Sequence, residues 1–238
     1  MNLKRYILVL LFLFFLLQPE VKSYANVYIV FYATYQGKTG HVGIAVSEYN
    51  FVVLEEVING SKIEKIDTQA NSELLYYDFW PNEDQFSVWN TGKNIEGVYY
   101  KLPIAKENEI TVSTLYQKGI PHKEYYPVDG ILKISTTWSQ DQQLRKILDK
   151  KIVLNKPFNG RRYNCCDFVI EVLENQFGFS FKAKEFIGLG WSSTPNKLYR
   201  SMKDTPGFMI IKDAGNKMNG TFFGQRVIYK LFNKKAAH

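Results

Sequence analysis

Strand patterns and helix patterns occupy different parts of this 238-residue chain, and this separation constrains the fold more than any other feature. In the first half, β-branched and aromatic runs alternate with turn residues such as Glu48-Tyr49-Asn50 and Asn59-Gly60, which is typical of antiparallel strands. Strands followed by helices indicate an α+β fold. The runs expected to be strands are 27–32, 42–46, 51–58, 62–66, 85–89 and 98–102.

The second half predicts three helices. Ser139-Gln140-Asp141-Gln142 has the pattern of a helix start with a capping box. Asn164 begins a second helix, in which apolar residues recur at intervals of three and four until Gly178 ends it. Thr194-Pro195 begins a third helix, because threonine is a good cap and proline suits the first helical position. Short strand-like pieces are expected afterwards, at 208–211 and 221–229.

The amino terminus has the pattern of a secretory signal peptide. Lys4 and Arg5 precede the apolar run 6–17, and small residues follow at Ser23-Tyr24-Ala25. The sequence therefore predicts a signal peptide at 1–25 and one mature domain at 26–238, secreted or periplasmic. Crossing a bilayer takes about 20 apolar residues, so no stable membrane span is expected after the signal is removed.

Charge and motifs exclude several classes of partner. The net charge is +7, but the lysines are scattered, which favours ordinary solubility over attraction to an anionic surface such as cell-wall polymer or lipid headgroups, and no nucleic-acid motif is present. The chain has no glycine-rich phosphate loop, and no pair of histidines or cysteines has the spacing of zinc ligands. No cofactor, no metal site and no nucleic-acid partner are therefore predicted.

The chain has two cysteines, and they are neighbours, Cys165 and Cys166. A bridge between neighbours closes a strained ring and constrains almost no loop, so at least one cysteine is expected to be a free thiol. A free thiol in an oxidising compartment is a liability unless its reactivity is used, which favours catalysis. The first turn of a helix stabilises a thiolate, so we expect Cys165 to be the nucleophile and Cys166 to be a packing residue.

His41 is the histidine best placed to assist this thiol. It begins a predicted strand, and it can take the thiol proton and return it to a leaving group. The backbone N–H of Cys165 can then contribute to an oxyanion hole. A carboxylate on the next strand is expected to orient the imidazole; Glu55 and Glu56 point to opposite faces, and we select Glu55. His122 lies in a turn-like stretch and is given no role.

At these residues the chain resembles the NlpC-like, papain-fold cysteine hydrolase superfamily. It resembles specifically the circularly permuted branch, which includes the lecithin retinol acyltransferase-like proteins. His41-Val42-Gly43-Ile44 is similar to the family's histidine strand, and Asn164-Cys165-x-x-Phe168-Val169 is similar to its nucleophile turn. The resemblance implies a circularly permuted papain-like fold, in which an antiparallel sheet packs against the helix bearing the cysteine. It also implies catalysis by Cys165 and His41, with Glu55 about where some permuted members carry a glutamate.

The resemblance and the residues together predict an exported thiol hydrolase with catalytic residues Cys165, His41 and Glu55. The acyltransferases use a second histidine that this chain lacks, which favours cleavage of amide bonds, above all in cell-wall peptidoglycan peptides. Two alternatives stay open: a lipid-directed acyltransferase or ester or thioester hydrolase, which an apolar groove beside Cys165 favours, and a non-catalytic binding module. The aromatic run 76–80 is expected to pack against the sheet or to line a groove, and 188–196 to form a wall near the site or a plain connector.

Overall fold

The computed structural model describes residues 25–58, 61–86, 90–103, 110–119, 128–188 and 190–229, and for residues 50–72 it describes only the backbone. Residues 1–24 of the predicted signal peptide, the Asn59-Gly60 turn and His122 lie outside the described residues. What the sequence predicts for them therefore stays a prediction.

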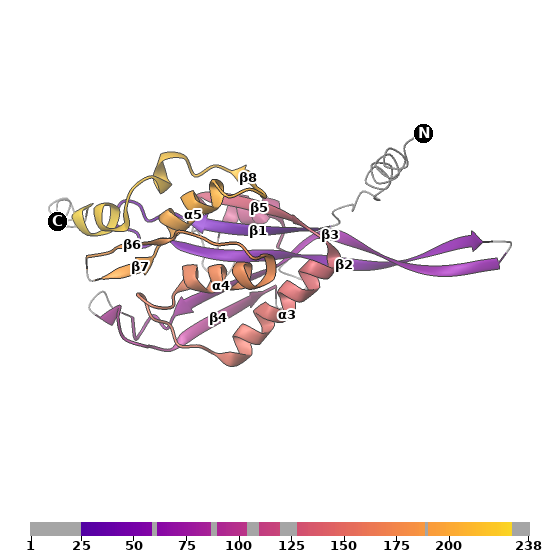
Figure 1. Ribbon diagram of the computed structural model, residues 1–238, viewed down its shortest axis with the longest axis horizontal. Coiled ribbons are helices and arrows are strands. Elements are labelled where there is room, and N and C mark those ends of the chain that lie inside the picture. Colours follow the sequence, from indigo (N-terminus) through magenta and orange to yellow (C-terminus); the bar gives the residue numbers. More distant parts are fainter. Residues whose placement is uncertain are drawn as a thin grey trace, which may run out of the picture.

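Six strands form one antiparallel sheet in the order β4-β3-β2-β1-β5-β8 (Figure 1). A smaller antiparallel sheet, of β6 and β7, lies apart from it. The α+β class predicted from the sequence is confirmed. The strands are β1 (Ala25–Tyr32), β2 (His41–Ile58), β3 (Ser61–Pro81), β4 (Gly97–Leu102), β5 (Gly130–Thr136), β6 (Lys184–Phe186), β7 (Trp191–Ser193) and β8 (Phe208–Lys212).

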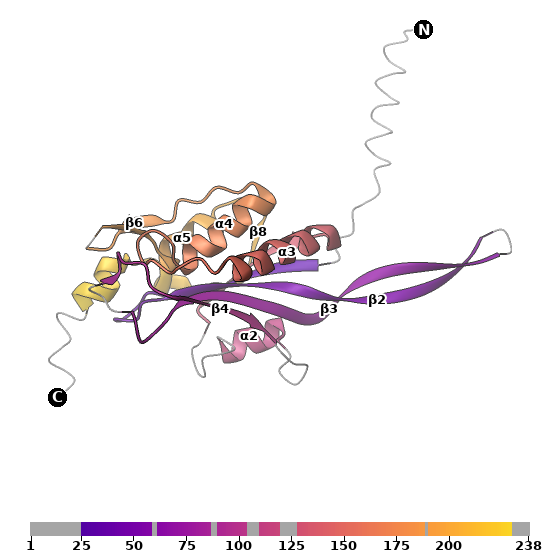
Figure 2. The same cartoon turned by 90° about the horizontal axis from the view of Figure 1, so that it is seen from below.

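Helices cover both faces of the large sheet (Figure 2). Three helices, α3 (Trp138–Leu154), α4 (Cys165–Phe177) and α5 (Pro195–Lys203), lie on one face, and α2 (Val112–Lys118) lies on the other. Side chains alternate along a strand, so β1 supplies Ile29 and Phe31 to the core under α3, α4 and α5, and Val30 and Tyr32 to the core beside α2. In the described part of the chain, every helix is too short or too polar to cross a lipid bilayer.

The predicted helix starts at Asn164 and Thr194 are confirmed, and Gly178 ends α4 in the left-handed conformation, at φ 70°. The start predicted at Ser139 is wrong by a few residues. Thr137 caps α3, because its hydroxyl accepts the Gln140 N–H while the Gln140 side chain accepts the Thr137 N–H. Two short helices, η3 (Gly215–Met218) and η4 (Phe223–Ile228), end the described chain.

Three strand predictions need correction. The runs 42–46 and 51–58 belong to one strand, β2, because Glu48-Tyr49-Asn50 forms no turn and is absorbed by a register shift between Ser47 and Tyr49. Gln85 lies in a turn, because Asn82 accepts the N–H groups of Asp84 and Gln85, and 87–89 lie outside the described residues.

The third correction concerns 221–229, where the structure has the helix η4 rather than a strand. Thr221 initiates this helix: its hydroxyl accepts the Gly224 N–H at 3.2 Å, and its carbonyl oxygen accepts the Gln225 N–H at 3.0 Å. A short apolar run does not distinguish strand from helix by periodicity, and here the local hydrogen bonds decide.

Candidate active site

Cys165 is the first residue of α4, where the cap fixes its position. Asn164 Oδ1 accepts the N–H groups of Cys166 at 2.8 Å and Asp167 at 3.4 Å, and Asp167 accepts the Asn164 N–H at 3.1 Å. Asn164 Nδ2 donates to the Ser193 carbonyl oxygen at 3.0 Å, which ties the helix start to β7. The N–H of Cys165 is the first-turn donor that this cap does not use, so it is available as an oxyanion donor.

His41 begins β2, and a buried asparagine anchors the loop before it. Asn196, in α5, accepts the Thr34 N–H at 2.8 Å and donates to the Thr34 carbonyl oxygen at 3.0 Å. Gly40 has φ 76°, and a Cβ there would lie 2.6 Å from the Thr34 hydroxyl oxygen, so glycine is required directly before His41. The anchored loop delivers the imidazole to the amino-terminal end of α4.

The structure brings His41 together with Cys165 and with a carboxylate that the sequence reasoning missed, Asp78. His41 is 3% exposed, and it lines the same cleft as Cys165, close enough for the charges of the two side chains to act on each other. Its Nε2 lies 3.3 Å from Asp78 Oδ2, which leaves Nδ1 for the sulfur. The Trp80 ring stacks on the imidazole, with the ring centroids 4.1 Å apart. Asp78 and Trp80 are alternate residues of β3, so both side chains reach His41 from the same face of the sheet.

Hydrogen bonds and charge favour an ion pair between the thiol and the imidazole. A hydrogen bond from the Cys166 thiol lowers the pKa of Cys165 well below its ordinary value despite burial, and the charge of His41 lowers it further. Burial acts to lower the pKa of His41, but the Cys165 charge and the hydrogen bonds of Asp78 and Cys165 raise it to about 9. At neutral pH these shifts favour a thiolate and an imidazolium.

Cys166 is fully buried, as expected of a packing residue, and in addition it contacts the nucleophile. Burial raises the pKa of the Cys166 thiol well above its ordinary value, and the neighbouring Cys165 charge adds to this effect. Cys166 therefore keeps its proton at a pH at which Cys165 has lost its own. Both cysteines are free thiols.

A buried tyrosine, Tyr76, lies close to Asp78 on the same face of β3. Asp78 and Tyr76 are fully buried, and the Tyr76 hydroxyl interacts with Asp78 and Tyr32. Burial first, and then the Asp78 charge, raise the pKa of Tyr76 well above its ordinary value, so this hydroxyl stays protonated. A Cβ at Gly43 would lie 2.2 Å from the Tyr76 hydroxyl oxygen, so the glycine of the His41-Val42-Gly43-Ile44 stretch makes room for the ring.

A cleft of about 290 Å³ opens beside the thiol and the imidazole. Ser192–Pro195 line it, which confirms the prediction that 188–196 contributes a wall, although Leu189 lies outside the described residues. Among the described lining residues, Glu83 is the single carboxylate, and there is no lysine or arginine. The largest apolar residues of the lining are Phe79, Trp80, Phe86, Phe158, Ile187 and Phe222.

The aromatic run 76–80 takes both of its predicted roles. Tyr76 and Tyr77 are buried on opposite faces of the sheet, whereas Phe79 and Trp80 line the cleft. Asp78 is the lone carboxylate in this run, which is the signal by which the sequence could have revealed it.

Glu55, which we selected to orient His41, does not lie beside it. Glu55 and Glu56 pair with Glu64 and Ile63 in the far part of the β2–β3 ladder, and their side chains lie outside the described ones. Glu55 is fourteen residues beyond His41 on the same strand, roughly 45 Å at the usual strand rise. Because β3 runs antiparallel to β2, it is the last part of β3 that returns to His41, and it carries Asp78.

Within the described ranges, no group of three or more histidine, cysteine, aspartate or glutamate side chains is arranged to hold a metal ion.

Comparisons of the chain with protein-family models, with curated proteins and with solved structures found no match. Function is therefore inferred from the residues and the geometry of the site.

Proposed function

We propose that the protein is a cysteine hydrolase that forms an acyl-enzyme on Cys165. The observation that carries this proposal is that Cys165 and His41 line one cleft, with Asp78 3.3 Å from the imidazole Nε2. A histidine strand that precedes a cysteine helix packed on an antiparallel sheet supports a circularly permuted papain-like fold. The signal-peptide pattern of 1–25 supports secretion or export to the periplasm.

In the first half-reaction, the Cys165 thiolate attacks the carbonyl carbon and forms a C–S bond. The carbonyl oxygen gains the negative charge, which the N–H of Cys165 is positioned to stabilise. When the tetrahedral intermediate collapses, the bond to the leaving group breaks and the His41 imidazolium protonates the leaving nitrogen or oxygen. The product is a thioester on Cys165 and a neutral His41.

In the second half-reaction, neutral His41 takes a proton from a water molecule that attacks the thioester. The C–S bond then breaks, the acyl group leaves as a carboxylic acid, and the thiolate and imidazolium return. Asp78 holds the imidazole in place through Nε2 and stabilises its positive charge, which is the role that the sequence reasoning gave to Glu55.

Our first candidate for the bond is an amide in a cell-wall peptide. An amine is a poor leaving group that needs a proton, and an imidazolium at neutral pH supplies one. The chain also lacks the second histidine that the resembling acyltransferases use.

The cleft walls favour a second candidate, an apolar acyl group carried on an ester or thioester. Five aromatic rings and Ile187 line the cleft, and such walls suit an acyl chain. A peptide substrate with free carboxylates would find no lysine or arginine among the described lining residues.

Alkylation with iodoacetamide tests the proposed chemistry independently of the substrate. At neutral pH we expect Cys165 to react at least about tenfold faster than an ordinary cysteine, and His41→Ala to remove the excess. Slow alkylation in the wild-type protein, unchanged in His41→Ala, would contradict the proposal and favour a non-catalytic binding module.

Two substrate sets separate the candidates, with Cys165→Ala as the control for both. Release of fragments from purified peptidoglycan supports the amide substrate. Hydrolysis of p-nitrophenyl esters that accelerates with acyl-chain length supports the acyl substrate. If Cys165 is hyper-reactive but the protein turns over neither set, both substrate candidates are wrong and only the proposed reactivity of Cys165 stands.

A further inference from the structure

Large apolar side chains are exposed around one side of the cleft. Trp191 is 65% exposed and Phe186 is 52% exposed, and they flank the tip of the β6–β7 hairpin. Phe223, Ile228 and Tyr229, in or directly after η4, are exposed as well. Several large apolar residues gathered at one end of a molecule are typical of an interaction site. We call these five residues the rim.

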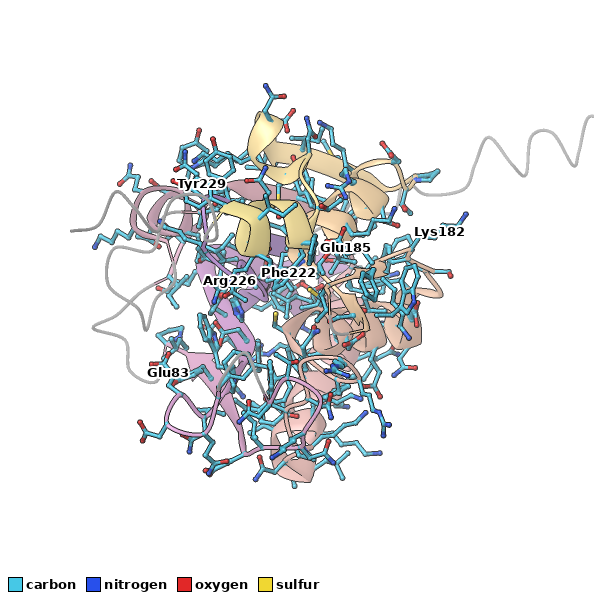
Figure 3. All side chains as sticks on the ribbon, turned by 90° about the vertical axis from the view of Figure 1, so that its left-hand side faces the viewer. Glu83, Lys182, Glu185, Phe222, Arg226 and Tyr229 are labelled. Carbon is cyan, nitrogen blue, oxygen red and sulfur yellow. The ribbon has the colours of Figure 1, made fainter. Side chains whose placement is uncertain are left out.

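Contacts between the hairpin and η4 hold the rim together. Phe186 and Trp191 form a cross-strand pair with ring centroids 6.2 Å apart. A Cβ at Gly188, in the hairpin, would lie 2.8 Å from the Phe223 ring, so the two segments are in contact. Both segments lie at the left-hand end of Figure 1, which faces the viewer in Figure 3.

The rim continues into the cleft. Ile187 and Phe222 line the cleft, and they are the sequence neighbours of Phe186 and Phe223 in the rim. Figure 3 shows Phe222 and Arg226 near the centre of this end of the molecule, and Glu83 below them to the left. An apolar surface therefore leads from the outside of the hairpin and η4 to the region of Cys165.

Basic side chains accompany the rim. Lys184 and Phe186 are alternate, exposed residues of β6, so they share its outer face. Two arginines nearby are partly buried: Arg161 lies against the hairpin tip, and Arg226, in η4, donates to the Gly37 carbonyl oxygen at 2.6 Å. The carboxylate of Glu185 faces inward instead: it is buried and accepts the Phe222 N–H at 3.0 Å. On this side of the cleft, the exposed cation Lys184 therefore lies beside the exposed ring of Phe186.

We propose that the rim docks on the surface of an anionic lipid bilayer. Indole and phenyl rings partition into the interface between headgroups and acyl chains, and adjacent cations bind anionic headgroups. Docking of this kind is superficial and needs no membrane-spanning helix. It places the mouth of the cleft at the level of the headgroups, where an apolar acyl group can enter; this last consequence rests on the proposed function, whereas the docking itself does not.

Flotation with lipid vesicles tests the docking. We expect the wild-type protein and Cys165→Ala to float equally with vesicles that contain phosphatidylglycerol. With vesicles of phosphatidylcholine alone, both proteins should remain in the unbound bottom fraction. The double variant Phe186→Ser, Trp191→Ser should lower the partition coefficient at least about tenfold, since it removes two interfacial rings. Lys184→Glu should lower it about fivefold or more, since one cation near an anionic surface is worth about 1 kcal/mol.

Matched controls lie away from the rim. Met209 and Ile210 of β8 are 52% and 46% exposed, so Met209→Ser, Ile210→Ser removes comparable apolar surface. Lys150→Glu, on the exposed side of α3, makes the same charge change as Lys184→Glu. Both controls should float like the wild type, and circular dichroism should show that every variant is folded.

Three outcomes would overturn the proposal. In the first, the wild-type protein does not float with anionic vesicles. In the second, the folded double variant floats as well as the wild type. In the third, the wild-type protein does not float but forms a dimer as its concentration rises, and the double variant does not dimerise; a second copy of the chain would then be the partner of the rim.

Discussion

The two ends of β2 have the same strand pattern and different surroundings. At its first residues β2 lies between β1 and β3, and Val42, Ile44 and Val46 are fully buried. Beyond Ser47 the pairing with β1 has ended, and β2 continues with β3 alone as a ribbon that projects from the body (Figure 1). A strand end that pairs with neighbours on both sides can hold an ionisable side chain in a buried site. The local sequence pattern does not show which end of β2 has two neighbours.

Substitutions at the two ends test this difference most directly. We expect Cys165→Ala to abolish turnover and His41→Ala to lower kcat/KM by at least about 1,000-fold, because nucleophile and base act as one unit. Glu55→Gln, on the ribbon, should stay within about twofold of the wild type. Steady-state kinetics on whichever of the two substrate sets the wild-type protein turns over measures all three, and a loss from Glu55→Gln as large as that from His41→Ala would place Glu55 in the site.

Asp78→Asn is expected to have the next largest effect, lowering kcat about 100-fold or more. The amide keeps the size of the carboxylate but loses the charge that stabilises the imidazolium. Glu64→Gln, on β3 in the ribbon, is the matched control and should have no effect. If Asp78→Asn left both kcat and the pH profile unchanged, His41 would be oriented by another group.

The pH dependence should show the ion pair. The pKa of His41 is raised to about 9, so the imidazolium is present below that pH, and kcat/KM for an amide should fall about tenfold per pH unit above it. The pKa of Cys165 is lowered, so alkylation should persist below neutral pH, where an ordinary thiol is protonated. In His41→Ala the alkylation profile should move to higher pH; a profile that does not move would contradict the ion pair.

The smallest expected effect concerns Cys166. Cys166→Ala removes the thiol that hydrogen-bonds Cys165, so the pKa of Cys165 should rise and alkylation at acidic pH should slow about fivefold, since such a bond is worth about 1 kcal/mol. Cys166→Ser retains a donor and should restore most of the rate. Equal rates in the alanine and serine variants would assign Cys166 to packing alone.

Much of the local structure is predictable from the sequence because it depends on neighbouring residues. The cap at Asn164, the end of α4 at Gly178 and the start of α5 at Thr194-Pro195 are each decided within one or two turns of helix. The α+β order follows from periodicity alone. Where several residues in the chain compete for a role, as at Ser139 and Thr137, local patterns placed the boundary only to within a few residues.

Only part of the candidate site can be predicted from local sequence patterns. Cys165 and His41 can be predicted as catalytic residues from their residue types and from their positions at the start of a helix and of a strand. Asp78 does not, because its role depends on which part of β3 returns to His41, and that depends on the length of the β2–β3 ladder. Because 48–50 forms no turn, 51–58 continues β2 away from His41 instead of returning to it, and 76–80 of β3 lies beside His41 in its place.

By itself, the sequence determined where α4 begins and ends, where α5 begins, that strands and helices are combined in one α+β fold, and which sulfur stands at a helix start. These depend on periodicity and on bonds between near neighbours. Tertiary structure alone decided that Asp78 and Trp80 contact His41, that Gly43 makes room for Tyr76, and that the rim lies beside the cleft. These contacts join residues far apart in the chain. They are set by strand register and by the packing of helices on the sheet, which no single segment encodes.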